Sequence, residues 1–159
     1  MIAMQNYKLT KLGTENIKEL TIYLLEVEGD FTPPLFQRIL DKSDAKSIND
    51  NANKLLSKAN VFSFLDNNII TSVIAIYAND FTNYNAYIPI LSVNKKYRGL
   101  GLASKLLEVS IKCASKNDMK QIYVRTWTDN YIAISLYEKF DFKIKKIDDN
   151  GILFIKFIR

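Results

Sequence analysis

The chain has 159 residues, and its 22 Lys and Arg against 17 Asp and Glu give a formal net charge of +5, with one cysteine and no histidine. The lack of histidine excludes Ser-His-Asp and Cys-His nucleophile systems, histidine-ligated zinc and an imidazole general base. A lone Cys113 excludes a disulfide framework and a thiolate-rich metal site within the chain, so no metal is expected.

The first third of the chain is predicted to be mainly helical. Apolar residues recur at helical spacing over residues 14–28 and again over about 44–59. Between these helices Pro33 and Pro34 interrupt the chain, because a residue before proline avoids the helical region. This connecting segment, which also contains Phe31 and Phe36, is a candidate mobile lid.

From residue 61 the pattern changes to that of strands. Residues 61–65 and 69–77 flank the turn signal Asp66-Asn67-Asn68, which predicts a β-hairpin. A further apolar run covers 84–93 and contains Pro89. Proline removes one donor from a strand ladder, so this strand is expected to have a bulge or to lie at an edge.

The remaining elements alternate between helix and strand. The spacing of apolar residues predicts helices over 101–116 and 130–140 and strands over 120–126, 142–147 and 152–158. This order predicts an α+β (mixed α/β) fold with a right-handed parallel crossover, in one domain over residues 1–159. The last strand is a candidate exposed edge.

Two glycines stand where the strand that ends at Val93 gives way to a helix, in Arg98-Gly99-Leu100-Gly101-Leu102-Ala103. Unpaired N–H groups and the helix dipole favour an anion at such a position, and glycine lets phosphates approach the main chain. The segment lacks the Gly-Lys-[Ser/Thr] of a P-loop and the third glycine of the dinucleotide fingerprint. On spacing alone, a tight turn without a ligand explains it equally well.

Two motifs taken together resemble those of a known family. Arg98-x-x-Gly101-x-Ala103 is similar to the acyl-CoA signature Arg/Gln-x-x-Gly-x-Gly/Ala of the GNAT family of N-acetyltransferases. About thirty residues on, the run that begins at Asn130 and contains Tyr137 resembles the family's second motif, Asn-x-x-Ala-x-x-Leu-Tyr-x-x-x-Gly-Phe. Asp141 replaces the glycine, and Asp tolerates the left-handed conformation better than most residues.

The resemblance covers about residues 61–157 and implies a GNAT-like fold with acetyl-CoA as cofactor. It implies a central mixed sheet of about six to seven strands, splayed between the fourth and fifth strands and flanked by about four helices. It further implies that the main chain around the end of the fourth strand polarises the thioester, at Leu91, Ser92 and Val93. The pyrophosphate would bind the N–H groups of Arg98, Gly99, Leu100, Gly101, Leu102 and Ala103.

Two side chains of the second motif have expected roles. By the resemblance, Tyr137 protonates the departing thiolate, and the reference pKa values of about 10 for tyrosine and about 8.5 for a thiol suit that transfer. The alternative is a tyrosine that only packs on its amphipathic helix. Asn130 is expected to cap its helix, to contact the cofactor, or both.

A general base is not evident, because the strand before Val93 contains no Asp or Glu. Asp80, Asp129 and Tyr87 are candidates because they lie at strand ends near the expected cleft, and an ordered water relay or Ser92 is the alternative. Cys113 falls on an apolar helix face and is expected to be a buried structural thiol, and Trp127 is expected in the core or on a cleft wall.

The predicted function is N-acetyl transfer from acetyl-CoA to a primary amine, with a non-catalytic acyl-CoA sensor as the alternative. A small-molecule acceptor is expected rather than a protein, and a homodimer stays open. Apart from two short clusters, at 95–98 and 143–146, the basic residues are scattered, and the chain lacks an aromatic-basic array on one predicted surface, which disfavours a nucleic-acid partner. No stretch resembles a secretory signal or the roughly 20 apolar residues of a membrane helix, so a cytoplasmic protein without a membrane partner is expected.

Overall fold

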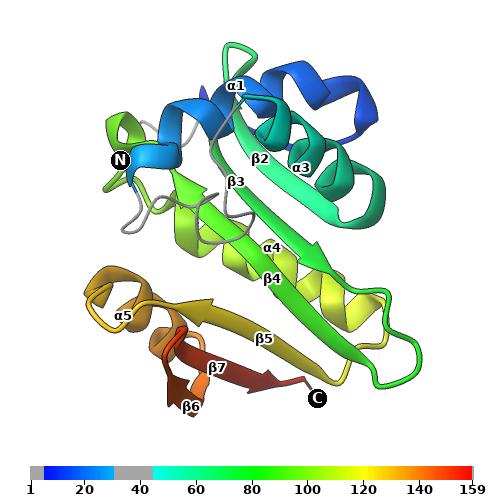
Figure 1. The fold of residues 1–159 in the computed structure, drawn as a ribbon, viewed down its shortest axis with the longest axis vertical. Helices are drawn as coiled ribbons and strands as arrows, with labels where there is room; N and C mark the ends of the chain where they lie inside the picture. Colours follow the sequence, from blue (N-terminus) through cyan, green and yellow to red (C-terminus); the bar gives the residue numbers. More distant parts are fainter. Residues whose placement is uncertain (1–5, 31–44, 159) are drawn as a thin grey trace.

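A computed structural model describes residues 6–30 and 45–158 of the chain (Figure 1). The candidate lid, with Phe31, Pro33, Pro34 and Phe36, lies outside these residues. The strands are β1 (Lys8–Leu12), β2 (Asn60–Asp66), β3 (Ile69–Tyr77), β4 (Asn85–Val93), β5 (Gln121–Thr126), β6 (Lys143–Asp148) and β7 (Gly151–Phe157). The helices are η2 (Thr14–Asn16), α1 (Ile17–Val27), η3 (Glu28–Asp30), α3 (Ala45–Lys58), η4 (Lys95–Tyr97), α4 (Leu102–Lys116) and α5 (Tyr131–Lys139).

The strands form one seven-stranded mixed sheet in the order β1-β2-β3-β4-β5-β7-β6. The β4–β5 pair is parallel and the other pairs are antiparallel, which confirms the expected α+β sheet. β1 was not predicted: only Leu12 of its residues is buried, so it lacks the apolar alternation by which a strand is recognised. The last strand, β7, was expected at an edge of the sheet. This expectation is wrong, because β7 lies between β5 and β6.

Two hydrophobic layers cover the sheet on opposite faces. Successive residues of β3 alternate between them: Val73 and Ala75 pack with α1 and α3, whereas Ile74 and Ile76 pack with α4. The layer on the α4 side also contains Tyr137 of α5. Figure 1 shows α1 and α3 over the first strands and α4 across the other face. None of the helices in the described ranges combines the length and the apolar composition that crossing a membrane requires.

The hairpin of β2 and β3 turns through Asn67 and Asn68, whose φ angles of 49° and 67° are those of a two-residue type I′ turn. Asparagine is among the few residues that adopt this left-handed conformation at low cost. The turn signal in the sequence therefore predicted this connection for a sound physical reason.

Pro89 marks an irregularity in β4, as expected. Tyr87 pairs with Tyr77 and Ile90 with Ala75, so two residues of β4 oppose the single Ile76 of β3. This bulge reverses which residues of β4 face each side of the sheet. Before it, the even-numbered Ile88 packs on the α4 side; after it, the even-numbered Ile90 packs under α1 and α3, and Leu91 packs on the α4 side.

The strands β4 and β5 diverge at the same place. Their pairing runs only from Asn85–Gln121 to Ile88–Val124, and Pro89 is the next residue of β4. Figure 1 shows the two strands spreading apart beyond this point. The splay expected between the fourth and fifth strands is thereby confirmed.

Candidate active site

A cavity of about 750 Å³ lies beyond the divergence of β4 and β5. Its walls are the end of β4, the loop into α4, the segment after β5 and one side of α5. This volume is within the roughly 300–1,000 Å³ of ordinary small-molecule sites. The structure brings every predicted site residue except Leu100 to this cavity; Leu100 packs against the core on the α4 side instead.

The loop into α4 depends on the backbone conformation of two glycines. Gly99 and Gly101 both have φ of +81°, in the left-handed region that other residues adopt only at a cost, and Gly101 caps α4. No protein atom lies within 4 Å of where a Cβ would stand on either glycine, so the backbone here faces open space. A ligand can therefore come close to the main chain.

The N–H groups of this loop are available as donors. The first intrahelical bond of α4 is donated by the N–H of Lys105 to the carbonyl of Gly101, so the N–H groups of residues 101–104 precede that ladder. The first turn of a long helix presents such groups together with the positive end of the helix dipole. The loop therefore has the donors and the field that bind an anion.

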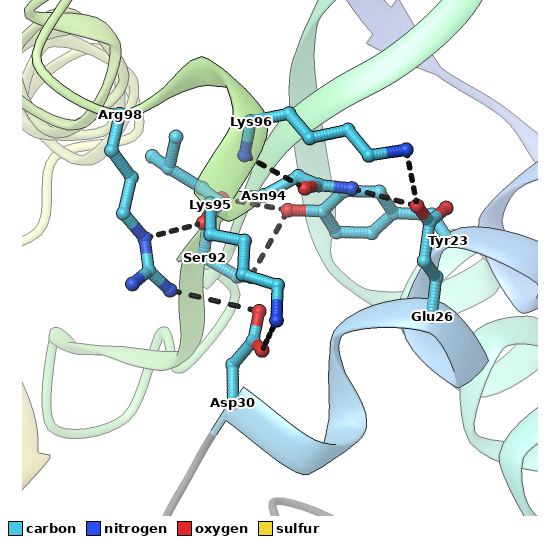
Figure 2. Close-up of polar contacts among 9 residues, drawn as sticks. Tyr23, Glu26, Asp30, Ser92, Asn94, Lys95, Lys96 and Arg98 are labelled. Atoms are coloured by element: carbon cyan, nitrogen blue, oxygen red, sulfur yellow. Dashed lines mark hydrogen bonds and ion pairs between the residues drawn. The ribbon is translucent and has the colours of Figure 1, made fainter.

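The side chain of Arg98 turns toward the end of β4 and toward Asp30, which sequence reasoning missed (Figure 2). Its Nε donates to the carbonyl of Val93 at 3.2 Å, and a terminal nitrogen lies 3.6 Å from Asp30 Oδ2. Lys95 Nζ lies 4.0 Å from the other carboxylate oxygen. Asp30 also lines the cavity. It ends η3 without any periodic pattern, so the sequence contained no signal for it.

Ser92 is held by Tyr23 of α1, a second residue that the sequence did not single out. The Tyr23 hydroxyl donates to the Ser92 carbonyl at 3.1 Å and lies 3.0 Å from Ser92 Oγ. Burial raises the pKa of Tyr23 well above its usual range, so the phenol stays protonated and remains a donor. In the sequence Tyr23 looks like an ordinary core position of an amphipathic helix.

Asn94 fixes the turn from β4 into η4. Its Nδ2 donates to Glu26 Oε1 at 3.0 Å, its Oδ1 accepts from the Lys96 N–H at 3.1 Å, and its own N–H donates to the carbonyl of Thr71 at 2.9 Å. Together with Tyr23 and Asp30, Glu26 ties α1 and η3 to the end of β4 and the loop after it (Figure 2).

Tyr137 on α5 both packs in the core and lines the cavity. It is 4% exposed, and its ring lies 5.7 Å from that of Phe142 and 5.6 Å from that of Phe154, between centroids. The end of α5 holds this position: the N–H groups of Phe142 and Asp141 donate to the carbonyls of Tyr137 and Glu138. Asp141 has φ of +66°, the left-handed conformation expected where the family motif has glycine.

Asn130 caps α5, as expected. Its Oδ1 accepts from the N–H of Ala133 at 3.2 Å, and its Nδ2 donates to Thr126 Oγ1 at 3.0 Å. The cap thus fastens the start of α5 to the end of β5, and Asn130 also lines the cavity.

The structure separates the candidates for the general base. Asp80 lies at the opposite end of the nine-residue β4 from Val93, about 30 Å away along an extended strand. The carboxylate of Asp80 accepts hydrogen bonds from the backbone N–H groups of Asn83 and Thr82, which lower the pKa of Asp80. Asp80 therefore stabilises the turn before β4. Tyr87 does not line the cavity, whereas Asp129, Ser92 and Trp127 do.

Cys113 lies on α4, away from the cavity. Its thiol is half-buried rather than buried, and this desolvation raises the pKa of Cys113. The described residues contain no group of three or more acidic or cysteine side chains placed to hold a metal ion.

The sequence profile of the acetyltransferase (GNAT) family matches residues 22–142. N-alpha-acetyltransferase 30 of Schizosaccharomyces pombe is 36% identical over 61 residues, which cover 38% of this chain and 41% of that protein. Spermine/spermidine N(1)-acetyltransferase of Bacillus subtilis is 31% identical over 77 residues, which cover 47% of this chain and 51% of that protein. The chain thus spans about half the length of these relatives or less.

Among solved structures, the PaiA N-acetyltransferase of Thermoplasma acidophilum in complex with coenzyme A superimposes with a TM-score of 0.75 at 16% identity. The superposition covers 96% of this chain and 99% of that one, which shows a shared fold. The match of the family profile extends over most of the chain and includes both motifs. This protein therefore belongs to the GNAT family of acetyltransferases.

Proposed function

We propose that this protein transfers the acetyl group of acetyl-CoA to a primary amine, by direct attack of the amine on the thioester. The observation that carries the proposal is the glycine loop of residues 98–104, which lines, except for Leu100, a cavity that Tyr137 also lines. The relative that was solved with coenzyme A has the same fold, which supports the choice of ligand. When bound, acetyl-CoA supplies the activated acyl group.

The residues at the cavity fit coenzyme A. The N–H groups of residues 98–103 would hold the pyrophosphate, and each hydrogen bond to a charged acceptor contributes roughly 1.5–3 kcal/mol. Three or four such bonds make a lysine clamp unnecessary. The splayed end of β4, Leu91 to Val93, would place main-chain groups beside the pantetheine arm and the thioester. Backbone donors fixed where negative charge develops need no histidine.

Tyr137 is the proposed general acid. A tyrosine phenol has a reference pKa of about 10, and that of Tyr137 would give its proton to the sulfur of the departing thiolate. Packing against Phe142 and Phe154 limits the positions that the ring can take, which keeps the hydroxyl in one place.

The amine must lose a proton as it attacks. Asp30 and Asp129 are the carboxylates among the residues that line the cavity, and Asp30 already pairs with Lys95 and Arg98. We therefore assign proton removal to Asp129, directly or through a water molecule.

The names of the two relatives suggest two kinds of acceptor. One indicates alpha-amino groups and the other spermine and spermidine. A small-molecule amine remains our first proposal. A thiol-release assay on spermidine and on short peptides with free amino termini compares the two kinds directly.

Substitution of Tyr137 by Phe tests the mechanism. We expect kcat to fall by about 100-fold, the range of general acid catalysis, with the Kd for coenzyme A changed less than twofold. The assay is thiol release with the best amine of the panel.

The matched control is Tyr131→Phe, since Tyr131 lies on the same helix, is 73% exposed and does not line the cavity. Equal kcat values for the Tyr137→Phe variant and the wild type would remove Tyr137 from the mechanism. A wild-type protein that binds acetyl-CoA but releases no thiol with any amine would favour the sensor function instead.

A further inference from the structure

Asp30 lines the cavity but has no role in the acetyl transfer proposed above. It is the last residue of η3, and its side chain, 18% exposed, lines the cavity next to the loop that precedes α4. Each of its two carboxylate oxygens has a different cation within 4.0 Å: Lys95 on one and Arg98 on the other. Asp30 is therefore a counter-ion built into the wall of the cavity.

Arg98 is the cation that matters for a ligand, because it begins the glycine loop and itself lines the cavity. Its guanidinium group contacts protein atoms on two sides, the Val93 carbonyl and the Asp30 carboxylate (Figure 2). The positive charge beside the loop is thus already neutralised in part before any anion arrives.

An anionic ligand at the loop would meet the Asp30 charge at short range. The Asp30 side chain is 18% exposed, whereas those of Arg98 and Lys95 are more than half exposed, so salt screens these pairs only in part. Phosphate groups and the Asp30 carboxylate would then compete for the same guanidinium group, and the repulsion between them would oppose binding.

We propose that Asp30 is an internal counter-ion that weakens the binding of coenzyme A by competing for Arg98. This inference rests on the proposed function, because it needs coenzyme A to bind at the glycine loop. The expected consequence is faster release of the product, since Asp30 recovers Arg98 as the phosphates leave. Product release limits turnover in many enzymes, so a residue that weakens product binding has a use.

The test is calorimetry of coenzyme A binding at low ionic strength with Asp30→Asn. The substitution keeps the shape of the side chain and removes its charge. We expect a Kd about fivefold lower than that of the wild type, at the low end of ordinary coupling between sites. The gain should shrink at high salt, where charge effects are screened. Asp30→Ser should change the Kd in the same direction.

Glu26→Gln is the matched control. It removes one negative charge from the same helical segment, but Glu26 pairs with Lys96 and Asn94 and does not line the cavity. We expect its Kd to stay within twofold of the wild type. In an Arg98→Gln background, Asp30→Asn should no longer tighten binding, because the shared partner is absent.

The result that would overturn the inference is unchanged or weaker binding by Asp30→Asn, which would mean that Asp30 positions Arg98 instead of opposing the ligand. Equal tightening by Glu26→Gln would also overturn it, since net charge alone would then be the cause. A wild-type protein that does not bind coenzyme A would contradict the proposed function itself and is recognised before any variant is compared.

Discussion

The helices on the two sides of the cavity contribute to it by different means. α4 and the loop before it offer main-chain N–H groups, made accessible by the left-handed Gly99 and Gly101. α1 and η3 offer side chains, Tyr23, Glu26 and Asp30, which contact the end of β4 and the loop after it. The main-chain N–H groups have a fixed geometry and can donate directly to a ligand. The side chains instead hold the loop in position and set the charge around it.

This difference predicts that changes in the loop before α4 affect binding first, whereas loss of the Tyr23 contacts of α1 affects stability first; Asp30, the charged member of that side, is the exception argued above. Gly101→Val should have the largest effect. Valine at φ of +81° is strained, and relaxation of the loop would misplace the N–H groups. We expect coenzyme A binding to weaken by at least about 100-fold in calorimetry, the loss of roughly two hydrogen bonds to a charged acceptor.

The control for this change is Gly29→Val. Gly29 also has no protein atom within 4 Å of where a Cβ would stand, but its φ lies outside the left-handed range. This variant should bind coenzyme A like the wild type. Normal binding by Gly101→Val, with a native circular dichroism spectrum, would show that the loop is not the anion site.

Tyr23→Phe tests the side-chain contacts. It leaves the Ser92 carbonyl and hydroxyl without their buried partner, which should lower the free energy of unfolding by about 1–3 kcal/mol in urea titrations. The Kd for coenzyme A should change less than threefold. A large loss of affinity with unchanged stability would reverse the proposed division between the two sides.

The same variant has a pH signature. Because burial raises the pKa of Tyr23 in the folded state, its stabilising contribution is complete below the unfolded pKa of about 10 and is lost as pH rises above it. The wild type should therefore lose stability above about pH 10 more steeply than Tyr23→Phe. Tyr77 and Tyr97, whose pKa values are also raised by burial, should leave a smaller residual slope in the variant.

Asp141→Gly should change stability the least of these variants. It tests what a left-handed backbone conformation costs a residue other than glycine. A left-handed conformation costs a non-glycine residue roughly 1–2 kcal/mol, less for Asp, so glycine should stabilise the protein by about 0.5–1 kcal/mol. Asp149→Gly is the control, because its φ is not positive, and it should give no gain. Equal thermal unfolding midpoints for the two variants would mean that the turn after α5 is not strained.

What could be predicted from the sequence follows the same division. Gly101, Asn67 and Asp141 occupy backbone conformations that few residues tolerate, so their identity carries information about local structure. Pro89 similarly predicted the bulge in β4, although not that the bulge would reverse which face Leu91 and Ile90 cover.

The contacts of Tyr23 and Asp30 could not be predicted, because they join segments about seventy residues apart through side chains that are common in any helix. β1 was missed for a related reason: it is an edge strand with little buried surface, so its residues are under little constraint to alternate. β7 was placed at an edge because the order of strands in a sheet is not encoded in local periodicity.

The outer strand β6 has a consequence for self-association. An edge strand presents unpaired N–H and C=O groups, onto which another strand can add. In β6 every residue is exposed, and three of them are lysines, Lys143, Lys145 and Lys146. A second copy that docked edge to edge would bring two such rows of positive charge together, on a chain whose net charge is already +5. The lysines, one of which pairs with Asp148 of the same strand, therefore disfavour strand addition at this edge.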